Sequence, residues 1–139
     1  MALNDIQLTS GLSITSGVEP YASASTTFTA SAETGFERGI KVEQLVGTDP
    51  ENVNIGDIDG TKEYFLQMRN MDDTHFVTVS VQKSAQVTTV AGIMRAGESF
   101  GPIRCGGQDV DGFPNWEMQA DTHACEVVVV ACTAGVYSA

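Results

Sequence analysis

The sequence predicts an all-β fold, an antiparallel β-sandwich that is jelly-roll-like and built from eight or nine short strands. Val and Thr are abundant and Leu is scarce, and β-branched side chains fit the pleated surface of a sheet. Alternating apolar and polar runs recur at roughly ten-residue spacing with Gly, Pro, Asn or Asp between them, which is typical of sandwiches and jelly rolls. No long window has the apolar spacing of an amphipathic helix.

In the first half of the chain, alternation indicates three strand segments separated by loops. The strand candidates are 3–15, 25–33 and 40–46, the first of them a bent strand or two short ones. Breakers indicate loops at 16–24 and at 47–61. The second of these loops is long and polar, so we expect it to be an exposed tip.

The second half of the chain is more regular. A short Asn-Met-Asp-Asp corner precedes a run in which His75 and three valines alternate with Phe76, Thr78 and Ser80. Gly92 indicates a possible bulge, and Pro102 indicates an edge strand because proline cannot donate to a ladder. The expected strands are 62–69, 74–82, 86–94, 99–105, 115–120 and 124–133.

The last strand, CEVVVVAC from Cys125 to Cys132, is apolar on both faces. In an antiparallel sandwich only one face of a strand is normally buried. Either this strand is central and covered on both sides, or its outer face meets another subunit, and the sequence leaves both alternatives open. The two cysteines lie seven residues apart, on opposite faces of an extended strand, so they should not pair with each other. With Cys105 the count is odd, and we expect free, buried thiols.

Length and charge exclude several classes of function. The 139 residues suit a single domain, 1–139, in which residues 1–34 could form an extended N-terminal arm. The net charge of −11, with few and scattered basic residues, argues against binding to nucleic acid or to an anionic membrane. No signal peptide and no apolar segment of membrane-spanning length is visible, so we expect synthesis in a cytosol.

Three sets of residues raise the question of a chemical site. Asp57-Ile-Asp59-Gly60 and Asp109-Val-Asp111-Gly112 resemble the start of a calcium loop, but neither has the full ligand spacing, and Asp-x-Asp-Gly is common in plain turns.

His123 and Cys125 would share a face in an extended segment and, with Cys105 or His75, could hold zinc or form a thiol–base pair. Trp116 could be a sugar platform, although a lone Trp is more often part of a core or an interface. The sequence therefore assigns no catalytic residue, no metal site and no cofactor.

Turn and strand motifs in residues 63–133 resemble a group of small structural proteins from tailed bacteriophages. Their pattern is a strand ending in Asn-x-Asp-x-Thr, a Gly-Glu turn before a Pro-containing strand, and an Ala-Asp-Thr-Ala stretch before a final hydrophobic strand. His75 stands where Asn is usual, and His123 interrupts the last motif. The matching residues are Asn70, Asp72, Thr74, Phe76 and Val77, then Ala96, Gly97, Glu98 and Pro102, then Ala120, Asp121, Thr122 and Ala124.

The resemblance implies a non-enzymatic virion protein with a jelly-roll-like fold, a decoration or cement protein on the capsid exterior. A tail, neck or fibre component is the alternative in the same class. A carbohydrate- or calcium-binding module and a Cys/His enzyme are the alternatives in other classes.

In this interpretation the protein works by adhesion. We expect a homo-oligomer, most simply a trimer. It would contact the major capsid protein or other virion proteins. Before assembly it would be in the host cytoplasm. The candidate interface residues are Val128, Val130, Phe76, Trp116, Ile6 and Leu8.

Overall fold

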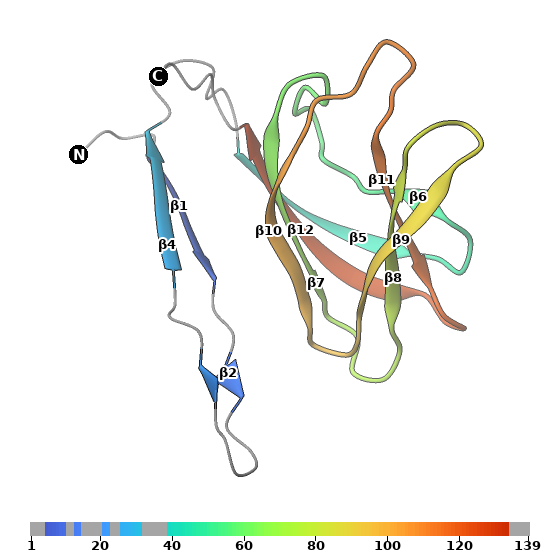
Figure 1. The fold of residues 1–139 in the computed structure, drawn as a ribbon. Coiled ribbons are helices and arrows are strands. Elements are labelled where there is room, and N and C mark those ends of the chain that lie inside the picture. Colours follow the sequence, from blue (N-terminus) through green and yellow to red (C-terminus); the bar gives the residue numbers. More distant parts are fainter. Residues whose placement is uncertain (1–4, 11–12, 15–20, 23–25, 32–38, 134–139) are drawn as a thin grey trace.

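The structure, a computed structural model, describes residues 39–133 in full and, before them, the backbone of residues 5–10, 13–14, 21–22 and 26–31 (Figure 1). All regular structure in these described residues is β-strand. Among them there is accordingly no helix of the length and apolarity that a membrane span requires. The all-β fold expected from the sequence is confirmed.

Four of the strands lie in the N-terminal part, where β1 pairs with β4 and β2 with β3, both antiparallel. Their bounds are β1 (Asp5–Ser10), β2 (Ser13–Ile14), β3 (Tyr21–Ala22) and β4 (Thr26–Ser31). The eight strands of the sandwich are β5 (Gly39–Val46), β6 (Glu51–Asn52), β7 (Tyr64–Asn70), β8 (Val77–Gln82), β9 (Thr88–Met94), β10 (Ser99–Cys105), β11 (Asn115–Ala120) and β12 (Cys125–Thr133).

These eight strands form two antiparallel sheets with the orders β10-β7-β12-β5 and β6-β11-β8-β9. The pairing is nested: the first strand pairs with the last, β5 with β12, and the inner pairs follow as β6 with β11, β7 with β10 and β8 with β9. Two sheets of four strands connected in this way are a jelly roll. In Figure 1, β8 and β9 lie in front of β5 and β12.

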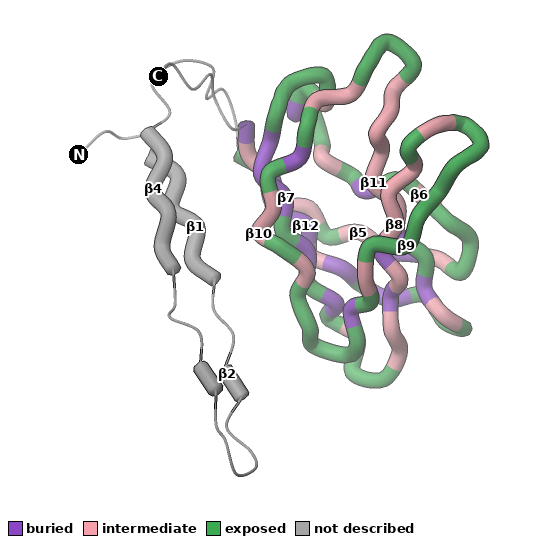
Figure 2. The backbone as a smooth tube through the Cα atoms, in the orientation of Figure 1, coloured by how far each residue is buried: buried purple, intermediate pink, exposed green. Residues whose placement is uncertain are grey.

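The core lies between the two sheets and follows the alternation of each strand. On β12, Val127, Val129 and Ala131 point inward and are buried, as are the inward residues of β7 and, on β8, Val77 and Val79 (Figure 2). Three methionines, Met68, Met94 and Met118, are fully buried among them. Flexible Met side chains fill irregular gaps between facing sheets.

Strands are present where the alternation predicted them in the described residues, with three corrections. The loop expected at 16–24 contains β3, which pairs with β2. The long polar loop at 47–61 contains β6, a two-residue strand that pairs with Glu117 and Met118 of β11. The bulge expected at Gly92 lies beside it, because Gly92 is opposite Val79 while Val90 is opposite Ser80, which leaves Ala91 as the extra residue. Gly92 has a different role, since a Cβ there would lie 3.0 Å from the ring of Phe100.

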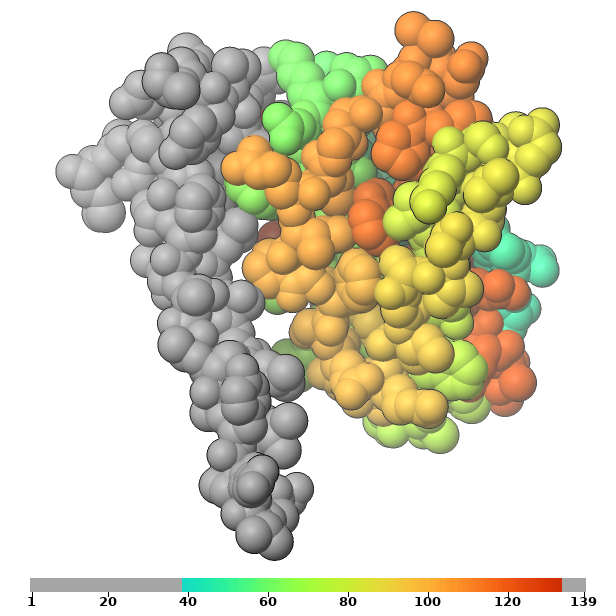
Figure 3. Space-filling model, in the orientation of Figure 1, coloured from blue at the N-terminus to red at the C-terminus, as the bar shows by residue number. Residues whose placement is uncertain are grey.

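The four edge strands of the two sandwich sheets differ in how they are protected against pairing with another chain. Strand β10 contains Pro102 and a register shift, β6 is two residues long, and β5 carries Lys41 and Glu43. Strand β9 has no charged residue and exposes Val90 and Ile93. Figure 3 shows this part of the chain, in yellow, at the surface.

The buried side chain of Asn70 joins the two sheets at one end of the sandwich. Its Nδ2 donates to the carbonyl oxygens of His75 (2.8 Å) and Met94 (3.1 Å), and its Oδ1 accepts the N–H of Asp72 (3.0 Å). Asn70 ends β7 in one sheet, whereas Met94 ends β9 in the other. The Asn-x-Asp corner noted in the sequence is therefore a connection between the two layers.

We expect Asn70→Ala to lower the free energy of unfolding by about 3 kcal/mol, because it leaves two carbonyls and one N–H without their partner. Urea denaturation would measure the loss. The matched control is Asn54→Ala, since Asn54 is exposed and accepts one hydrogen bond, from the N–H of Gly56. An Asn70→Ala loss no larger than that of the control would contradict the role of this amide.

Candidate functional site

The candidate site is the outer face of the β10-β7-β12-β5 sheet, centred on β12. This strand lies between β7 and β5, so it is central in its sheet as well as apolar on both sides. Its outward residues Val128 and Val130 are not buried, and Val130 is 44% exposed. Within the described residues the strand is thus central but not covered on its outer side, which favours the second of the two alternatives, a contact with another subunit.

The sheet register places charged residues on either side of each outward valine. Val128 lies opposite Glu43 on β5 and opposite Arg69 on β7. Val130 lies opposite Lys41 on β5 and opposite Gln67 on β7. Because neighbouring strands are about 4.8 Å apart, each valine sits in the middle of a short row that crosses three strands.

A third row adds apolar surface at one end of the face. Glu126 of β12 lies opposite Leu45 on β5, and its carbonyl oxygen accepts the N–H of Met71 (2.8 Å) just beyond β7. Leu45 is 68% exposed and Met71 is 49% exposed. This row therefore presents one large apolar side chain on each side of β12.

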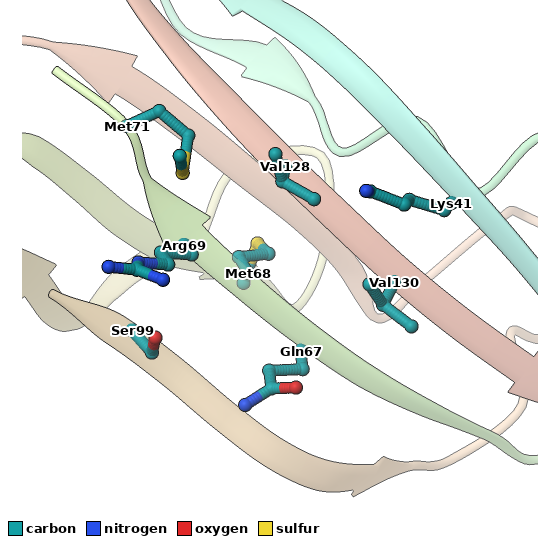
Figure 4. Close-up of a pocket in the computed structure, with 8 residues that line it drawn as sticks. All are labelled: Lys41, Gln67, Met68, Arg69, Met71, Ser99, Val128 and Val130. Carbon is teal, nitrogen blue, oxygen red and sulfur yellow. The ribbon is translucent and has the colours of Figure 1, made fainter. Parts of the chain in front are cut away.

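The face is hollowed between β12 and β7, where the outward side chains leave a shallow depression of about 350 Å³ (Figure 4). In Figure 4, Val128 and Val130 lie between Lys41 on β5 and the β7 side chains Gln67 and Arg69. The residues around the depression are Lys41, Gln67, Met68, Arg69, Met71, Ser99, Val128 and Val130.

The charges on this face balance each other, unlike those of the whole protein. Lys41 and Arg69 oppose Glu43 and Glu126, whereas the protein carries a net charge of −11. Among the described residues, neither Glu43 nor Lys41 is in an ion pair. The Arg69 Nε donates to the carbonyl oxygen of Gly97 (3.3 Å). The face is thus locally neutral, with charges that are open to an external partner.

The structure places the six candidate interface residues in different environments. Val128 and Val130 lie on the outer face just described. Phe76 precedes β8 and lies 5.7 Å from the guanidinium carbon of Arg95. Trp116 packs against the core beside Phe100, with ring centroids 5.8 Å apart. Ile6 and Leu8 belong to β1, where only the backbone is described. An interface role for these last four residues stays a prediction.

The sequence did not indicate the other residues of this face, which are Glu43, Leu45, Arg69 and Met71. Their positions depend on the register between strands that are far apart in the chain. One local signal was available, because Leu45 is an apolar residue in phase with Lys41 and Glu43.

The histidines and Cys125 meet at the end of the sandwich near Asn70. The rings of His75 and His123 are stacked with centroids 4.4 Å apart, and His75 Nδ1 is 3.3 Å from Asp121 Oδ1. Cys125 Sγ approaches the backbone carbonyl of His123 (3.5 Å) rather than an imidazole nitrogen. No cluster of three or more His, Cys, Asp or Glu that could hold a metal occurs in the described part of the chain.

The three thiols are free, and all have raised pKa values. Burial raises the pKa of Cys105 to about 11, although hydrogen bonds with Tyr64 and Trp116 oppose the shift. Burial is also the main cause at Cys132 and at Cys125, where the carboxylates of Asp72 and Asp121 add to it. Because the thiolate is the reactive form, these shifts lower the reactivity of all three cysteines.

The Asp-x-Asp-Gly segments use their first or second carboxylate to close a turn. Asp109 Oδ1 accepts the N–H groups of Asp111 (2.9 Å) and Phe113 (3.2 Å). Asp59 Oδ1 accepts the N–H and the hydroxyl of Thr61, and these bonds lower the pKa of Asp59. Both carboxylates therefore have the turn role that is common for Asp-x-Asp-Gly segments.

Comparisons with known proteins do not assign the chain to a family. No family model matches it, and no curated protein matches it. One solved structure that is similar is described by the words "Bacillus endospore appendages form a novel family of disulfide-linked pili". It is 11% identical, with a TM-score of 0.45, over 69% of this chain and 85% of the other. A match at this level carries no argument about function, and it gives no support to a phage origin.

We expect the native thiols to resist alkylation. At about pH 8, iodoacetamide should label Cys105 and Cys125 slowly in the native protein and rapidly in concentrated urea, because burial both shields the sulfur and disfavours the thiolate. Peptide mapping by mass spectrometry would measure each site, with the urea sample as the control. Fast native labelling of Cys125 would instead support the Cys/His enzyme.

Proposed function

We propose that the protein is a non-enzymatic structural protein that acts by packing the outer face of its β10-β7-β12-β5 sheet against another subunit. The observation that carries the proposal is the exposure of Val128 and Val130 in the middle of a central strand. A central strand that faced only water would carry polar residues at these positions. Burial of such apolar surface is the main driving force of protein association.

The proposal that the protein is not an enzyme is supported by the state of its candidate nucleophiles. A thiol nucleophile needs a lowered pKa or an adjacent base. Burial raises the pKa values of Cys105, Cys125 and Cys132, and Cys125 Sγ faces a carbonyl oxygen.

We extend the proposal to a phage particle, where the protein would decorate the capsid exterior, with the tail or neck as the alternative position. This step is supported by the sequence resemblance of residues 63–133. The acidic charge adds to it, since a protein that lined packaged DNA would rarely be so negative.

The first test is the mass of the protein in solution, by light scattering after size exclusion. We expect an oligomer for the natural sequence and a monomer for Val130→Asp, because it puts a charged group in the apolar centre of the interface, where burial is costly. The matched control is Val110→Asp, since Val110 is fully exposed in the 106–114 loop. An unchanged mass for Val130→Asp, or a natural protein that is monomeric at every concentration, would overturn the proposal.

The position on a particle needs a separate test. Purified protein would be incubated with phage heads that lack it and with isolated tails, and the bound protein located by electron microscopy. Binding over the whole head surface would support decoration, and a single ring or fibre would support the tail or neck. If neither bound, the phage setting would fail while assembly through this face could still stand.

A further inference from the structure

We infer that the partner on the outer face is a second copy of this chain, held face to face by a two-fold axis parallel to β12. This inference rests on the proposed function and specifies its partner. In such an isologous contact the same patch meets itself, so each side of the patch must complement the other. The rows of Val128 and Val130 satisfy this condition. The row of Glu126 satisfies it at its two ends, Leu45 and Met71, but brings the two Glu126 carboxylates together at the axis.

A rotation of 180° about an axis along β12 exchanges the β5 side of the face with the β7 side and leaves each row opposite itself. The row of Val128 then places Glu43 of one copy opposite Arg69 of the other, twice in the dimer. These are opposite charges, and within one copy they are separated by Val128. The two copies would therefore complete two ion pairs that a single copy cannot form.

The same rotation matches the apolar row with itself. Leu45 on the β5 side meets Met71 on the β7 side of the second copy, and both side chains are about half exposed or more. Val128 and Val130 meet their own equivalents across the axis. The partner's β5 side chains thus enter the depression beside β7, which is lined by Gln67, Arg69 and Met71.

Local neutrality favours a second copy over an unrelated partner. Two copies that each carry −11 repel one another over most of their surfaces. On this face Lys41 and Arg69 offset Glu43 and Glu126, so the copies can approach here without net repulsion. Complementary charges would also fix the register of the contact.

A second two-fold arrangement has to be distinguished from this one. An axis across the strands would place Glu43 opposite Lys41 of the second copy and Leu45 opposite Gly39, which leaves the large apolar side chain without an apolar partner. The axis along β12 pairs Leu45 with Met71 and Glu43 with Arg69, and sets only the two exposed Glu126 carboxylates, at one end of the face, against each other. It is the arrangement that we infer. Reversing Lys41 distinguishes the two axes.

The experiment measures the dimer dissociation constant by analytical ultracentrifugation for Glu43→Arg, for Arg69→Glu, for the double variant and for an equimolar mixture of the two single variants. Each single reversal should weaken the dimer about tenfold or more, because like charges then face each other twice. The double variant should return to within about threefold of the natural protein. The mixture should do the same, since the two single variants complement each other across the axis.

Two controls protect this interpretation. Arg69→Glu also loses the bond to Gly97, so thermal melting of each variant must show an intact fold. Lys41→Glu, which faces Gln67 under the inferred axis, should weaken the dimer less than about threefold.

The remaining outcomes separate the inference from the proposed function. If Val130→Asp dissociates the oligomer but no charge reversal is rescued by its partner, the inferred axis is wrong and assembly through the face stands. Rescue of Glu43→Lys by Lys41→Glu would replace the axis with the one across the strands. A measured trimer, the order expected from the sequence, would also overturn the two-fold contact. A natural protein that stays monomeric removes both proposals.

Discussion

The buried amide of Asn70 fixes the phase of β7, and the outer face depends on that phase. Its side chain must point inward, because it bonds to His75, Asp72 and Met94 on elements that belong to the other sheet or lead into it. In a strand the residues before and after then point outward. Arg69 and Met71 are therefore held on the outer face by a hydrogen-bond network on the inner side.

How much of this arrangement is readable in the sequence follows from the range of the interactions involved. Alternation is a local signal, and it indicated most strands and the two-sided character of β12. Pro102 is equally local, and it indicated the edge position of its strand. Strand β6 was missed because Glu51 and Asn52 become a strand only by pairing with β11, far along the chain. The rows across the face were missed for the same reason. Glu43 and Arg69 are far apart in the chain, and they fall into one row only because both strands pair with β12 on either side of Val128. The resemblance to phage proteins stays untested by the fold.

The electrostatics of the protein restrict where it can associate. An excess of negative charge keeps such a chain soluble and opposes contact between copies. The part of the outer face around β12 departs from this background, because Lys41 and Arg69 lie there beside Glu43 and Glu126. Apolar side chains alone would give a contact of low specificity, whereas charges placed on either side of Val128 restrict the copies to one register.

The β9 edge gives the protein a second surface with a different consequence. It belongs to the opposite sheet, so a dimer closed through the outer face leaves both β9 edges accessible. A two-fold contact uses the same patch on each copy and ends there, whereas added edge pairing would join dimers into larger species. Species heavier than a dimer that persist when Val130 is replaced by Asp would therefore come from β9, where Val90 and Ile93 are exposed, and not from the face.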